Sequence, residues 1–356
     1  MSELTSKLMT YLERAVADEA SDIFLVAGGP VSLKLEGRIC PIDEKRLLPP
    51  DTQELLTQIY ALAGRSMDVF EKTGDDDFSF AVNGLARFRV NAYRQRNSMA
   101  AVVRIVSFDI PHWEDLHILP QVMDLADTPH GMILVTGTAG SGKSTTQACI
   151  IDRINRTHDY HIVTLEDPIE FLHRNQRSIV SQREIAIDTS DYLSALRACL
   201  RQAPDVILLG EMRDAETIRT AITAAETGHT VIATLHTNGA VNAINRIIDS
   251  FSASHQEQIR VQLATVLRTV VSQQMMPDVN GAMIPAFEIM HVNNAIRGLI
   301  RDNKNHQIDN AIQAGRAEGM VTMDQSILNL YKERRITRET ALLYADHPEQ
   351  LQRQLN

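Results

Sequence analysis

The sequence predicts an α/β fold, a parallel sheet covered by helices, preceded by a smaller α+β domain. From residue 121 onward, short apolar runs alternate with helical segments, which is typical of strands buried on both faces of a parallel sheet. Before residue 106, apolar and polar residues alternate along longer runs, which indicates antiparallel strands with one open face. A chain of 356 residues is too long for one ordinary compact core, so two domains are expected.

The first domain is expected over residues 1–105. Apolar residues recur at helical spacing over residues 3–18, which predicts an amphipathic helix. Strands are expected in "SDIFLVAGGPVSLKLEGRICPI" around its glycine-proline turn, followed by a helix near residues 51–70. Farther along, Arg87 and Arg89 alternate with apolar residues, which places both arginines on the open face of antiparallel strands.

A linker and a second domain are expected to follow. Residues 106–120 contain prolines and mixed polarity, so they are interpreted as the linker. The second domain is expected over residues 121–356, with strands in "GMILVTG", "HIVTLED", "DVILLGE" and "HTVIATLH". Beyond residue 240 a helical region is expected, because one apolar stripe runs through Ile259, Leu263, Val266, Leu267, Val270 and Val271.

Charge and composition exclude several classes of protein. The net charge of -10 argues against bulk nucleic acid or an anionic membrane surface as the main partner. The three cysteines form no CxxC pair, so they are interpreted as reduced thiols, and a structural zinc site is not expected. No run approaches the roughly 18 apolar residues of a membrane span, and the N-terminus mixes acids with apolar residues, unlike a signal peptide. We therefore expect a cytoplasmic chain that reaches a membrane only through partners.

The stretch "GTAGSGKSTTQ" matches the GxxxxGK[ST] pattern of a phosphate-binding loop. It follows a predicted strand and opens a predicted helix, the context that separates a working P-loop from a chance match. Its backbone N–H groups are expected to surround phosphates, with Lys143 on the β and γ oxygens and Ser144 on magnesium. The predicted cofactors are therefore ATP and Mg²⁺. The residues expected to bind the nucleotide are Gly137, Thr138, Ala139, Gly140, Ser141, Gly142, Lys143, Ser144 and Thr145.

Carboxylates follow two further predicted strands. "TLEDPIEF" supplies Glu166, Asp167 and Glu170, and "LLGEMRD" supplies Glu211. Hydrolysis needs a carboxylate to orient or deprotonate water, and usually a second one to hold magnesium through its waters. Because ligands bind at the carboxyl ends of strands in open α/β sheets, acids at two such ends beside a P-loop predict an active site.

Histidines flank another predicted strand, in "ETGHTVIATLHT". His236 follows the strand on the predicted ligand side, so it is a candidate for sensing the γ-phosphate. His229 precedes the strand, and by itself it is as readily a core or surface residue. The scattered His112, His158 and His173 are interpreted as surface residues.

Six stretches in order along the chain resemble the secretion ATPase superfamily (GspE/PilT-like), most closely the PilT-type retraction ATPases of type IV pili. They are "GSGKSTT", "TLEDPIEF", "QREIAIDT", "ALRACLRQAPDVILLGEMRD", "TAAETGHTVIATLHT" and "NRIIDSF". Upstream, "SDIFLVAGGPVSLKLEGRI" and "ARFRVNAYRQR" resemble the N-terminal PAS-like domain of that family. The resemblance extends across nearly the whole chain, and it implies a RecA-like P-loop ATPase core.

The resemblance also implies roles for individual residues. Glu170 matches the catalytic glutamate of the Asp box, and Glu211 matches the Walker B acid that binds magnesium through water. His229 and His236 match the His box. Arginines of the N-terminal domain, chiefly Arg89 and Arg104, resemble those that reach a nucleotide, whereas Arg94 and Arg96 are as readily solvated side chains on a sheet face.

Within the superfamily, the sequence favours the retraction branch. Extension and type II secretion ATPases usually carry paired CxxC motifs and longer N-terminal regions, and this sequence shows neither. "AIRGLIRD" resembles the retraction motif AIRNLIRE, from which Gly298 and Asp302 depart. Asn245 stands where Asp is common, and Thr138 and Ala139 stand where the family often has Pro and Thr. Because Gly298 departs from the retraction motif, the sequence determines the ATPase chemistry better than it determines whether the motor retracts or extends a pilus.

The sequence therefore predicts a homohexameric ATPase that couples MgATP hydrolysis to type IV pilus retraction, pilin disassembly and twitching motility. The expected partners are further copies of the chain, an inner-membrane platform protein and other pilus ATPases, with no nucleic acid and no direct membrane insertion. The alternatives within the family are a pilus extension, type II secretion or accessory PilU-like ATPase. From other classes, a DNA-translocating RecA-like motor and a nucleotide-gated binding module without turnover stay open.

Overall fold

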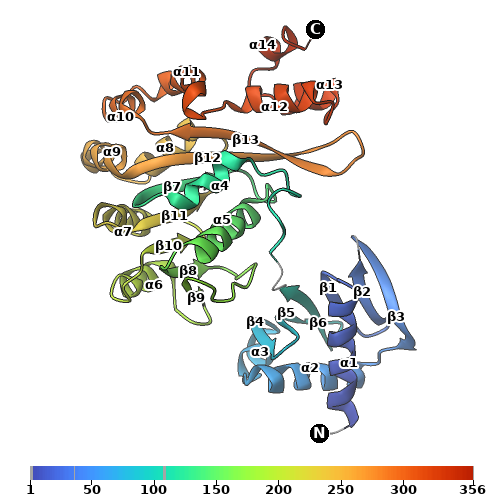
Figure 1. The fold of residues 1–356 in the computed structure, drawn as a ribbon. Coiled ribbons are helices and arrows are strands. Elements are labelled where there is room, and N and C mark those ends of the chain that lie inside the picture. Colours follow the sequence, from blue (N-terminus) through green and yellow to red (C-terminus); the bar gives the residue numbers. More distant parts are fainter. Residues whose placement is uncertain (1–2, 36, 107–109, 356) are drawn as a thin grey trace. The chain divides into compact units, whose positions relative to one another are not determined.

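The computed structural model describes residues 3–35, 37–106 and 110–355, and divides into two compact units, residues 1–109 and 110–356 (Figure 1). Each unit has its own sheet and its own apolar core. Of the predicted linker, residues 107–109 lie outside the described residues, and residues 110–120 belong to the second unit.

The first unit is an α+β domain, as predicted. Its antiparallel sheet has the strand order β3-β2-β1-β6-β5-β4. Apolar side chains of α1, α2 and the sheet share one buried cluster, which includes Leu12, Ile59 and Val90. The strands are β1 (Asp22–Leu25), β2 (Pro30–Leu35), β3 (Arg38–Arg46), β4 (Asp75–Val82), β5 (Ala86–Gln95) and β6 (Ser98–Val106). The helices are α1 (Glu3–Ala17), α2 (Pro49–Ala63) and α3 (Asp68–Thr73).

The helix predicted near residues 51–70 is in fact two helices. Gly64 adopts a left-handed conformation, with φ of 60°, directly after α2, and its N–H donates to the carbonyls of Ala61 and Tyr60. This is the usual way in which a glycine ends a helix. The chain then starts again at Asp68 as α3, so the apolar residues that suggested one helix belong to two.

The second unit is built on a seven-stranded sheet with the order β13-β12-β7-β11-β10-β8-β9. All neighbouring strands are parallel except β12 and β13. The strands are β7 (Gly131–Thr136), β8 (His161–Glu166), β9 (Ile179–Glu184), β10 (Val206–Leu209), β11 (Thr230–Leu235), β12 (Leu267–Pro277) and β13 (Met283–His291).

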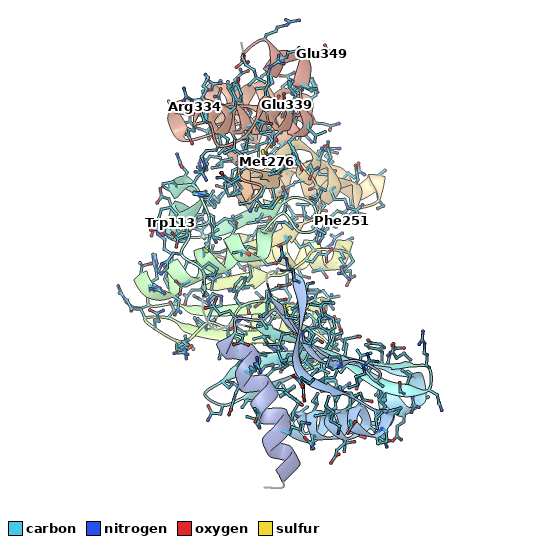
Figure 2. The ribbon with its side chains drawn as sticks, turned by 90° about the vertical axis from the view of Figure 1, so that its right-hand side faces the viewer. Trp113, Phe251, Met276, Arg334, Glu339 and Glu349 are labelled. Carbon is cyan, nitrogen blue, oxygen red and sulfur yellow. The ribbon has the colours of Figure 1, made fainter. Side chains whose placement is uncertain are left out.

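Helices cover this sheet on both faces, which explains why its strands are apolar throughout (Figure 1). In β7, Met132 packs into one apolar cluster and Ile133 into the other, on the opposite face. Figure 2 shows Trp113 and Phe251, which belong to these two clusters, on opposite sides of the unit. The helices are α4 (Pro120–Met123), α5 (Lys143–Thr157), α6 (Tyr192–Cys199), α7 (Ala215–Glu226), α8 (Ala240–Asp249), α9 (Ala253–Val266), α10 (Asn294–Arg301), α11 (Ile308–Ala314), α12 (Met323–Lys332), α13 (Arg338–Tyr344) and α14 (Pro348–Gln352), with short 3₁₀ turns at Asp124–Asp127, Asn305–Gln307 and Gly315–Glu318.

The predicted helical stripe from Ile259 to Val271 is wrong in its second half. Helix α9 ends at Val266, and Leu267 begins β12. Val270 and Val271 face opposite sides of the sheet, because they belong to the two different apolar clusters. No glycine or proline separates α9 from β12, so the apolar spacing of the helix continues into the strand without a visible break.

Two further features concern exposure. Strand β9 was not expected, because it is a sheet edge whose residues Ile179–Glu184 are mostly polar and partly exposed. Among the described residues, no helix is both long enough and apolar enough to pass through a membrane.

Candidate nucleotide-binding site

The predicted P-loop lies at the carboxyl end of β7 and opens α5. It borders a pocket of about 580 Å³ that is also lined by the segments after β8 and β10 and by the end of β11. Because these strands are parallel, the residues that follow them meet at one edge of the sheet, where open α/β sheets bind ligands. The pocket therefore occupies the position that the sequence predicts for the active site.

The structure brings most of the predicted nucleotide-binding residues to this pocket. Gly137, Thr138 and Ser141 complete the loop without being part of the lining. The loop and helix residues that line the pocket include Ala139, Gly140, Gly142, Lys143, Ser144 and Thr145.

Lys143 is held inside the P-loop itself. Its Nζ donates to the carbonyl oxygens of Gly137 at 2.9 Å and Thr138 at 2.6 Å, and the residue is only 6% exposed. Burial lowers the pKa of Lys143, and the nearby charge of Glu211 acts in the opposite direction. A buried ammonium held by neutral carbonyls is a strong attraction for an anion such as a phosphate.

Gln273 of β12 supports the P-loop from behind and was missed by the sequence analysis. Its backbone oxygen lies 2.3 Å from where a Cβ on Gly137 would stand, so only glycine fits there, and the φ of Gly137 is +143°. Its side-chain Oε1 accepts from Thr146 Oγ1 at 2.8 Å in the buried first turn of α5. The sequence carried no signal for this contact, because the Gln273 segment was predicted to be helical.

Glu211, at the end of β10, lies beside Arg213 and His236. Arg213 Nε donates to its Oε2 at 2.6 Å, and His236 Nε2 lies 3.5 Å from its Oε1. All three side chains line the pocket. Arg213 was not among the predicted site residues, although it stands in the motif that supplies Glu211.

The segment after β8 supplies carboxylates with different surroundings. Glu170 and Asp167 line the pocket and are exposed. The Glu166 carboxylate accepts from Thr164 Oγ1 at 2.6 Å and from Gln182 Nε2 at 3.2 Å. Burial raises the pKa of Glu166 to about 7 against these hydrogen bonds. Around neutral pH, Glu166 therefore changes charge, while Glu170 stands open to the pocket.

His173 belongs to this pocket, so its interpretation as a surface residue is wrong. It lies in the segment between β8 and β9, and its backbone N–H donates to Gln182 Oε1 at 2.8 Å. Burial lowers the pKa of His173 to about 4, so its imidazole is neutral at pH 7. Its Nδ1 is buried and has no hydrogen-bond partner among the residues that the structure describes.

His229 is not brought to the pocket. It precedes β11 (Thr230–Leu235), whereas His236 follows that strand, so the two histidines lie at opposite ends of it. The Nδ1 of His229 contacts the carbonyl oxygen of Ala224 at 2.9 Å, and its own carbonyl accepts from Gly131 N. His229 lies in the turn between α7 and β11. Ligands bind at the carboxyl ends of the strands in such a sheet, so a residue that precedes β11 lies away from the pocket.

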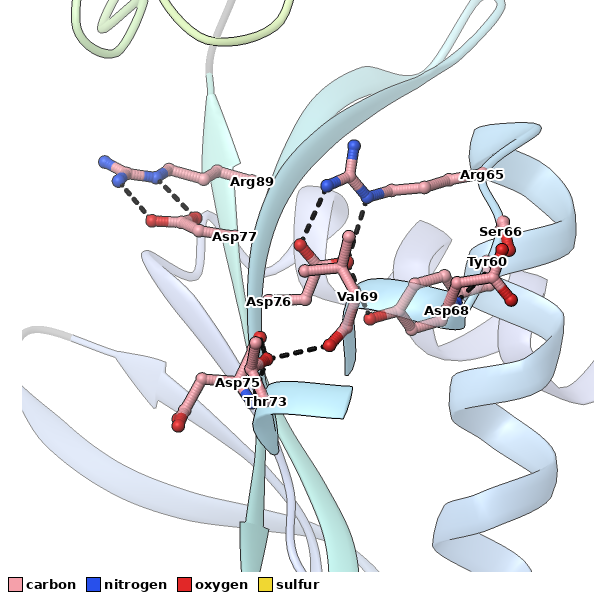
Figure 3. Close-up of polar contacts among 10 residues, drawn as sticks. All are labelled: Tyr60, Arg65, Ser66, Asp68, Val69, Thr73, Asp75, Asp76, Asp77 and Arg89. Atoms are coloured by element: carbon pink, nitrogen blue, oxygen red, sulfur yellow. Dashed lines mark hydrogen bonds and ion pairs between the residues drawn. The ribbon is translucent and has the colours of Figure 1, made fainter. Parts of the chain in front are cut away.

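The arginines predicted to reach a nucleotide lie in the first unit, each beside an aspartate. Arg89 of β5 forms a two-bond ion pair with Asp77 of β4, with N–O distances of 3.1 and 2.6 Å (Figure 3). Arg104 of β6 donates to Asp22 of β1 at 3.0 Å, and its side chain is 61% exposed.

A different kind of pair lies next to Arg89. Arg65 donates to Asp76, and the hydroxyl of Tyr60 donates to the same carboxylate (Figure 3). Asp76 is buried, so this pair belongs to the core, whereas Arg89 and Asp77 stand at the surface of the sheet.

The family model for type II/IV secretion system proteins matches residues 2–351. The chain belongs to this family. It is 42% identical to the type IV pilus retraction ATPase PilT of Pseudomonas aeruginosa over 332 residues, which cover 93% of this chain and 95% of that protein. The type IV pilus ATPase PilU of the same organism is 37% identical over 94% of this chain and 87% of its own length. A crystal structure of the pilus retraction motor PilT with bound ADP has a TM-score of 0.89 and 43% identity, with 99% of both chains covered.

These similarities confirm the predicted membership of the PilT-type secretion ATPases and the predicted RecA-like core with its smaller N-terminal domain. The solved relative contains ADP. In the present chain, the pocket at the P-loop has the residues that suit nucleotide binding. Nucleotide binding, as predicted, follows from membership of the family together with the geometry of the site.

Proposed function

We propose that this chain is an ATPase motor that couples MgATP hydrolysis to type IV pilus retraction, and with it to pilin disassembly and twitching motility. The observation that carries the proposal is the pocket itself. Lys143, Glu170 and Glu211 meet there, in a chain that resembles a retraction ATPase over nearly its full length. A phosphate cradle with carboxylates beside it can hold magnesium and activate water, which nucleotide hydrolysis uses.

Each side chain of the pocket has a task in this proposal. Lys143 exchanges its loop carbonyls for the β and γ oxygens of the nucleotide, and Glu170 accepts the proton of the attacking water. His236, beside Glu211, reports the γ-phosphate to the rest of the chain. We leave His229 outside the catalytic set, because its side chain is held in a turn at the other end of β11.

The residues at the P-loop fit a magnesium ion. Among the described residues, no group of three or more His, Cys, Asp or Glu forms a closed metal site. Magnesium at a nucleotide does not need one, because it keeps several waters and takes its other ligands from phosphates and one or two protein oxygens. The exposed Ser144 hydroxyl is the direct ligand in this proposal, and Glu211 binds through water. When bound, the ion neutralises charge on the phosphate oxygens.

The assembly in the proposal is a homohexamer whose sites are completed in trans. Arg89 and Arg104 of one subunit reach the nucleotide held by the P-loop of a neighbour. Hydrolysis and release relax this contact, and the change passes to an inner-membrane platform protein, with other pilus ATPases as further partners. The motor works in the cytoplasm, where partners hold it at the membrane. In this proposal residues 1–105 supply the arginines, residues 121–356 hold the nucleotide, and residues 106–120, of which 110–120 pack with the second unit, connect the two.

An accessory PilU-like role is the second candidate. It is favoured by the similar identity to PilU and by Gly298 and Asp302, which depart from the retraction motif in α10. Deletion of the gene in its host separates the candidates. Retraction predicts hyperpiliated, non-motile cells, an accessory role predicts piliated cells with weakened motility, and bald cells would indicate extension instead.

The chemistry is tested with Lys143→Ala. This change removes the cation of the cradle, and loss of one such contact costs about 10²- to 10³-fold in turnover. Phosphate release by the purified variant should fall accordingly, while its circular dichroism spectrum stays that of the wild type. Unchanged turnover in a folded variant would contradict the ATPase proposal.

A further inference from the structure

A second cavity, of about 520 Å³, lies on the second unit between the start of α8, the end strand β13 and the C-terminal helices. Glu288 of β13 belongs to its lining and is only 6% exposed. Figure 1 shows β12 and β13 between the rest of the sheet and the helices α10–α14. Glu288 therefore stands where the nucleotide-binding part of the unit meets its C-terminal part.

The Glu288 carboxylate binds the start of α8 in a cavity that it shares with the start of α12. Its Oε1 accepts from the backbone N–H of Ala240, the first residue of α8, at 2.7 Å. Met323, the first residue of α12, lines the same cavity. The first N–H groups of a helix lack intrahelical partners and carry partial positive charge, so an ionised acid suits the start of α8. Glu288 thus fixes α8 to β13, the strand that lies against α12.

The α8 side of this link leads to the nucleotide pocket. His236, which lines the pocket and approaches Glu211, belongs to the short segment that ends in Ala240. Within that segment, the N–H of Gly239 donates to Ser272 Oγ at 2.9 Å, and Ser272 stands opposite Glu288 in the β12–β13 register. The position of His236 therefore depends on two anchors, one on each strand.

The α12 side leads to the C-terminal helices. The backbone N–H of Phe287, next to Glu288, donates to Ser326 Oγ of α12 at 3.0 Å. On the neighbouring strand β12, Gln273 supports the P-loop. The β12–β13 pair is thus hydrogen-bonded to α12 on one side and, on the other, to the first turn of α5 and to the segment between β11 and α8.

Ionisation of the buried Glu288 lowers the stability of the folded chain. Burial raises its pKa to about 7, with smaller contributions in the same direction from Asp346 and Asp309, while the N–H groups of Ala240 and Met323 lower it. The pKa of Glu288 in the folded chain lies above the ordinary value, so protonation of Glu288 favours the folded state. This contribution to stability is present below about pH 4.5 and is lost as the pH rises through about 7. The charged and titratable groups that share the cavity are Asp309, Asp324, Asp346, His306, His347 and Arg316.

We propose that Glu288 is a positioning residue that couples the C-terminal helices to the nucleotide pocket, because its ionised carboxylate fixes the start of α8 to β13, the strand bound to α12 through Phe287 and Ser326, and so keeps His236 in place against Glu211. The inference rests on the proposed ATPase function. A purely structural acid at this position would be replaced by glutamine with equal or better stability above pH 7 and with no change in catalysis.

The test compares the wild type with Glu288→Gln, which keeps the shape but cannot ionise. At about pH 8 the variant should melt no lower than the wild type, because it avoids the cost of a buried charge. Its kcat should nevertheless fall roughly tenfold to a hundredfold, with little change in KM for ATP, because misplacement of a group near the reaction costs rates of this size. The wild-type kcat should rise as the pH passes about 7, because Glu288 ionises there, and this rise should be smaller in the variant.

Two controls keep the result specific. Glu257→Gln removes an exposed carboxylate on α9 and should leave both kcat and its pH profile unchanged. Glu166 titrates in the same pH range, so only the difference between the wild type and Glu288→Gln counts. Wild-type kcat and an unaltered pH profile in Glu288→Gln would overturn the inference.

Hydrogen exchange gives a readout that does not depend on turnover. In the wild type, after correction for intrinsic rates, the amide of Ala240 should be better protected at about pH 8 than at about pH 6, since it binds the ionised carboxylate. In Glu288→Gln this difference should vanish. Absence of the difference in the wild type would overturn the inference even if the chain is an active ATPase. A protected but inactive wild type would instead contradict only the proposed function.

Discussion

The two units of this chain place their charges in opposite ways. In the second unit, Glu166, Glu170 and Glu211 gather around the buried Lys143 at one pocket. In the first unit, Arg89 and Arg104 stand opposite each other on β5 and β6, and each is paired with an aspartate of the next strand. The pocket with the phosphate cradle is thus rich in acids around Lys143, and the further arginines proposed for the γ-phosphate are on the other unit.

This difference suggests how catalysis is divided. Acids around a P-loop can hold magnesium and activate water, but the charge that develops on the γ-phosphate needs further cations. Arg213 complicates the division, because it lines the pocket in the second unit and is bound to Glu211. The comparison therefore turns on whether Arg213 or the arginines of the first unit stabilise the transition state.

The largest expected effect comes from the arginines. A positioned arginine at a transferring phosphoryl group is worth about 10³- to 10⁵-fold in rate. Arg104→Ala or Arg89→Ala should cause a loss of this order in the assembled protein, measured as phosphate release. Arg46→Ala, at an exposed position of β3, is the matched control and should be silent.

Arg213→Ala tests whether the second unit supplies its own catalytic arginine. Because the account assigns the γ-phosphate to the arginines of the first unit and leaves Arg213 as the ion-pair partner of Glu211, we expect the loss of Arg213 to cost less than the loss of Arg104. If Arg213→Ala removes turnover while Arg89→Ala and Arg104→Ala leave it intact, the site is completed within one subunit and the division between units is wrong.

A smaller loss is expected from the acids. Glu170→Gln keeps the shape and hydrogen bonding of the side chain but removes the base, and losses of general-base catalysis run to about 10²- to 10⁴-fold. Binding of a fluorescent ATP analogue should survive. If binding collapses while slow turnover persists, Glu170 is structural or linked to the metal, and Glu211 becomes the better candidate for the base.

The smallest effect concerns the backbone, and it compares a glycine of each unit. Gly137→Ala places a Cβ about 2.3 Å from the Gln273 backbone oxygen, so the P-loop or β12 must move. At Gly28 in the first unit, with φ of +94°, a Cβ meets nothing within 4 Å. Gly28→Ala should cost about 1 to 2 kcal/mol of unfolding free energy from backbone strain alone. Chemical denaturation should show a larger loss for Gly137→Ala, and equal losses would mean that the contact with Gln273 is unimportant.

The sequence was a good guide wherever the signal is local. The P-loop, the buried strands and the acids that follow them each occupy a short stretch, and the parallel sheet then brings Lys143, Glu170 and Glu211 together at one edge. Gly137 is a similar case, since its glycine-rich pattern already indicates a turn around phosphates. These features are predictable because neighbouring residues determine them.

What the sequence did not predict depends on contacts between distant segments. Gln273 reaches the P-loop only because β12 joins the sheet beside β7, and its segment continues the apolar spacing of α9. His173 looks like a surface residue until Gln182 of the unexpected strand β9 binds the same loop. Glu288 is an isolated acid in an apolar run, and nothing near it in the sequence indicates that its carboxylate binds the start of α8.

Completion of the site in trans is tested most directly by mixing two inactive chains. Arg104→Ala has an intact P-loop, and Lys143→Ala has an intact arginine. In mixed rings some interfaces pair the two, so the account predicts partial recovery of phosphate release. A mixture of Glu170→Gln and Lys143→Ala is the control, since both residues line the same pocket and cannot complement each other across an interface. No recovery in the first mixture, or full activity in a demonstrably monomeric wild type, would contradict the account.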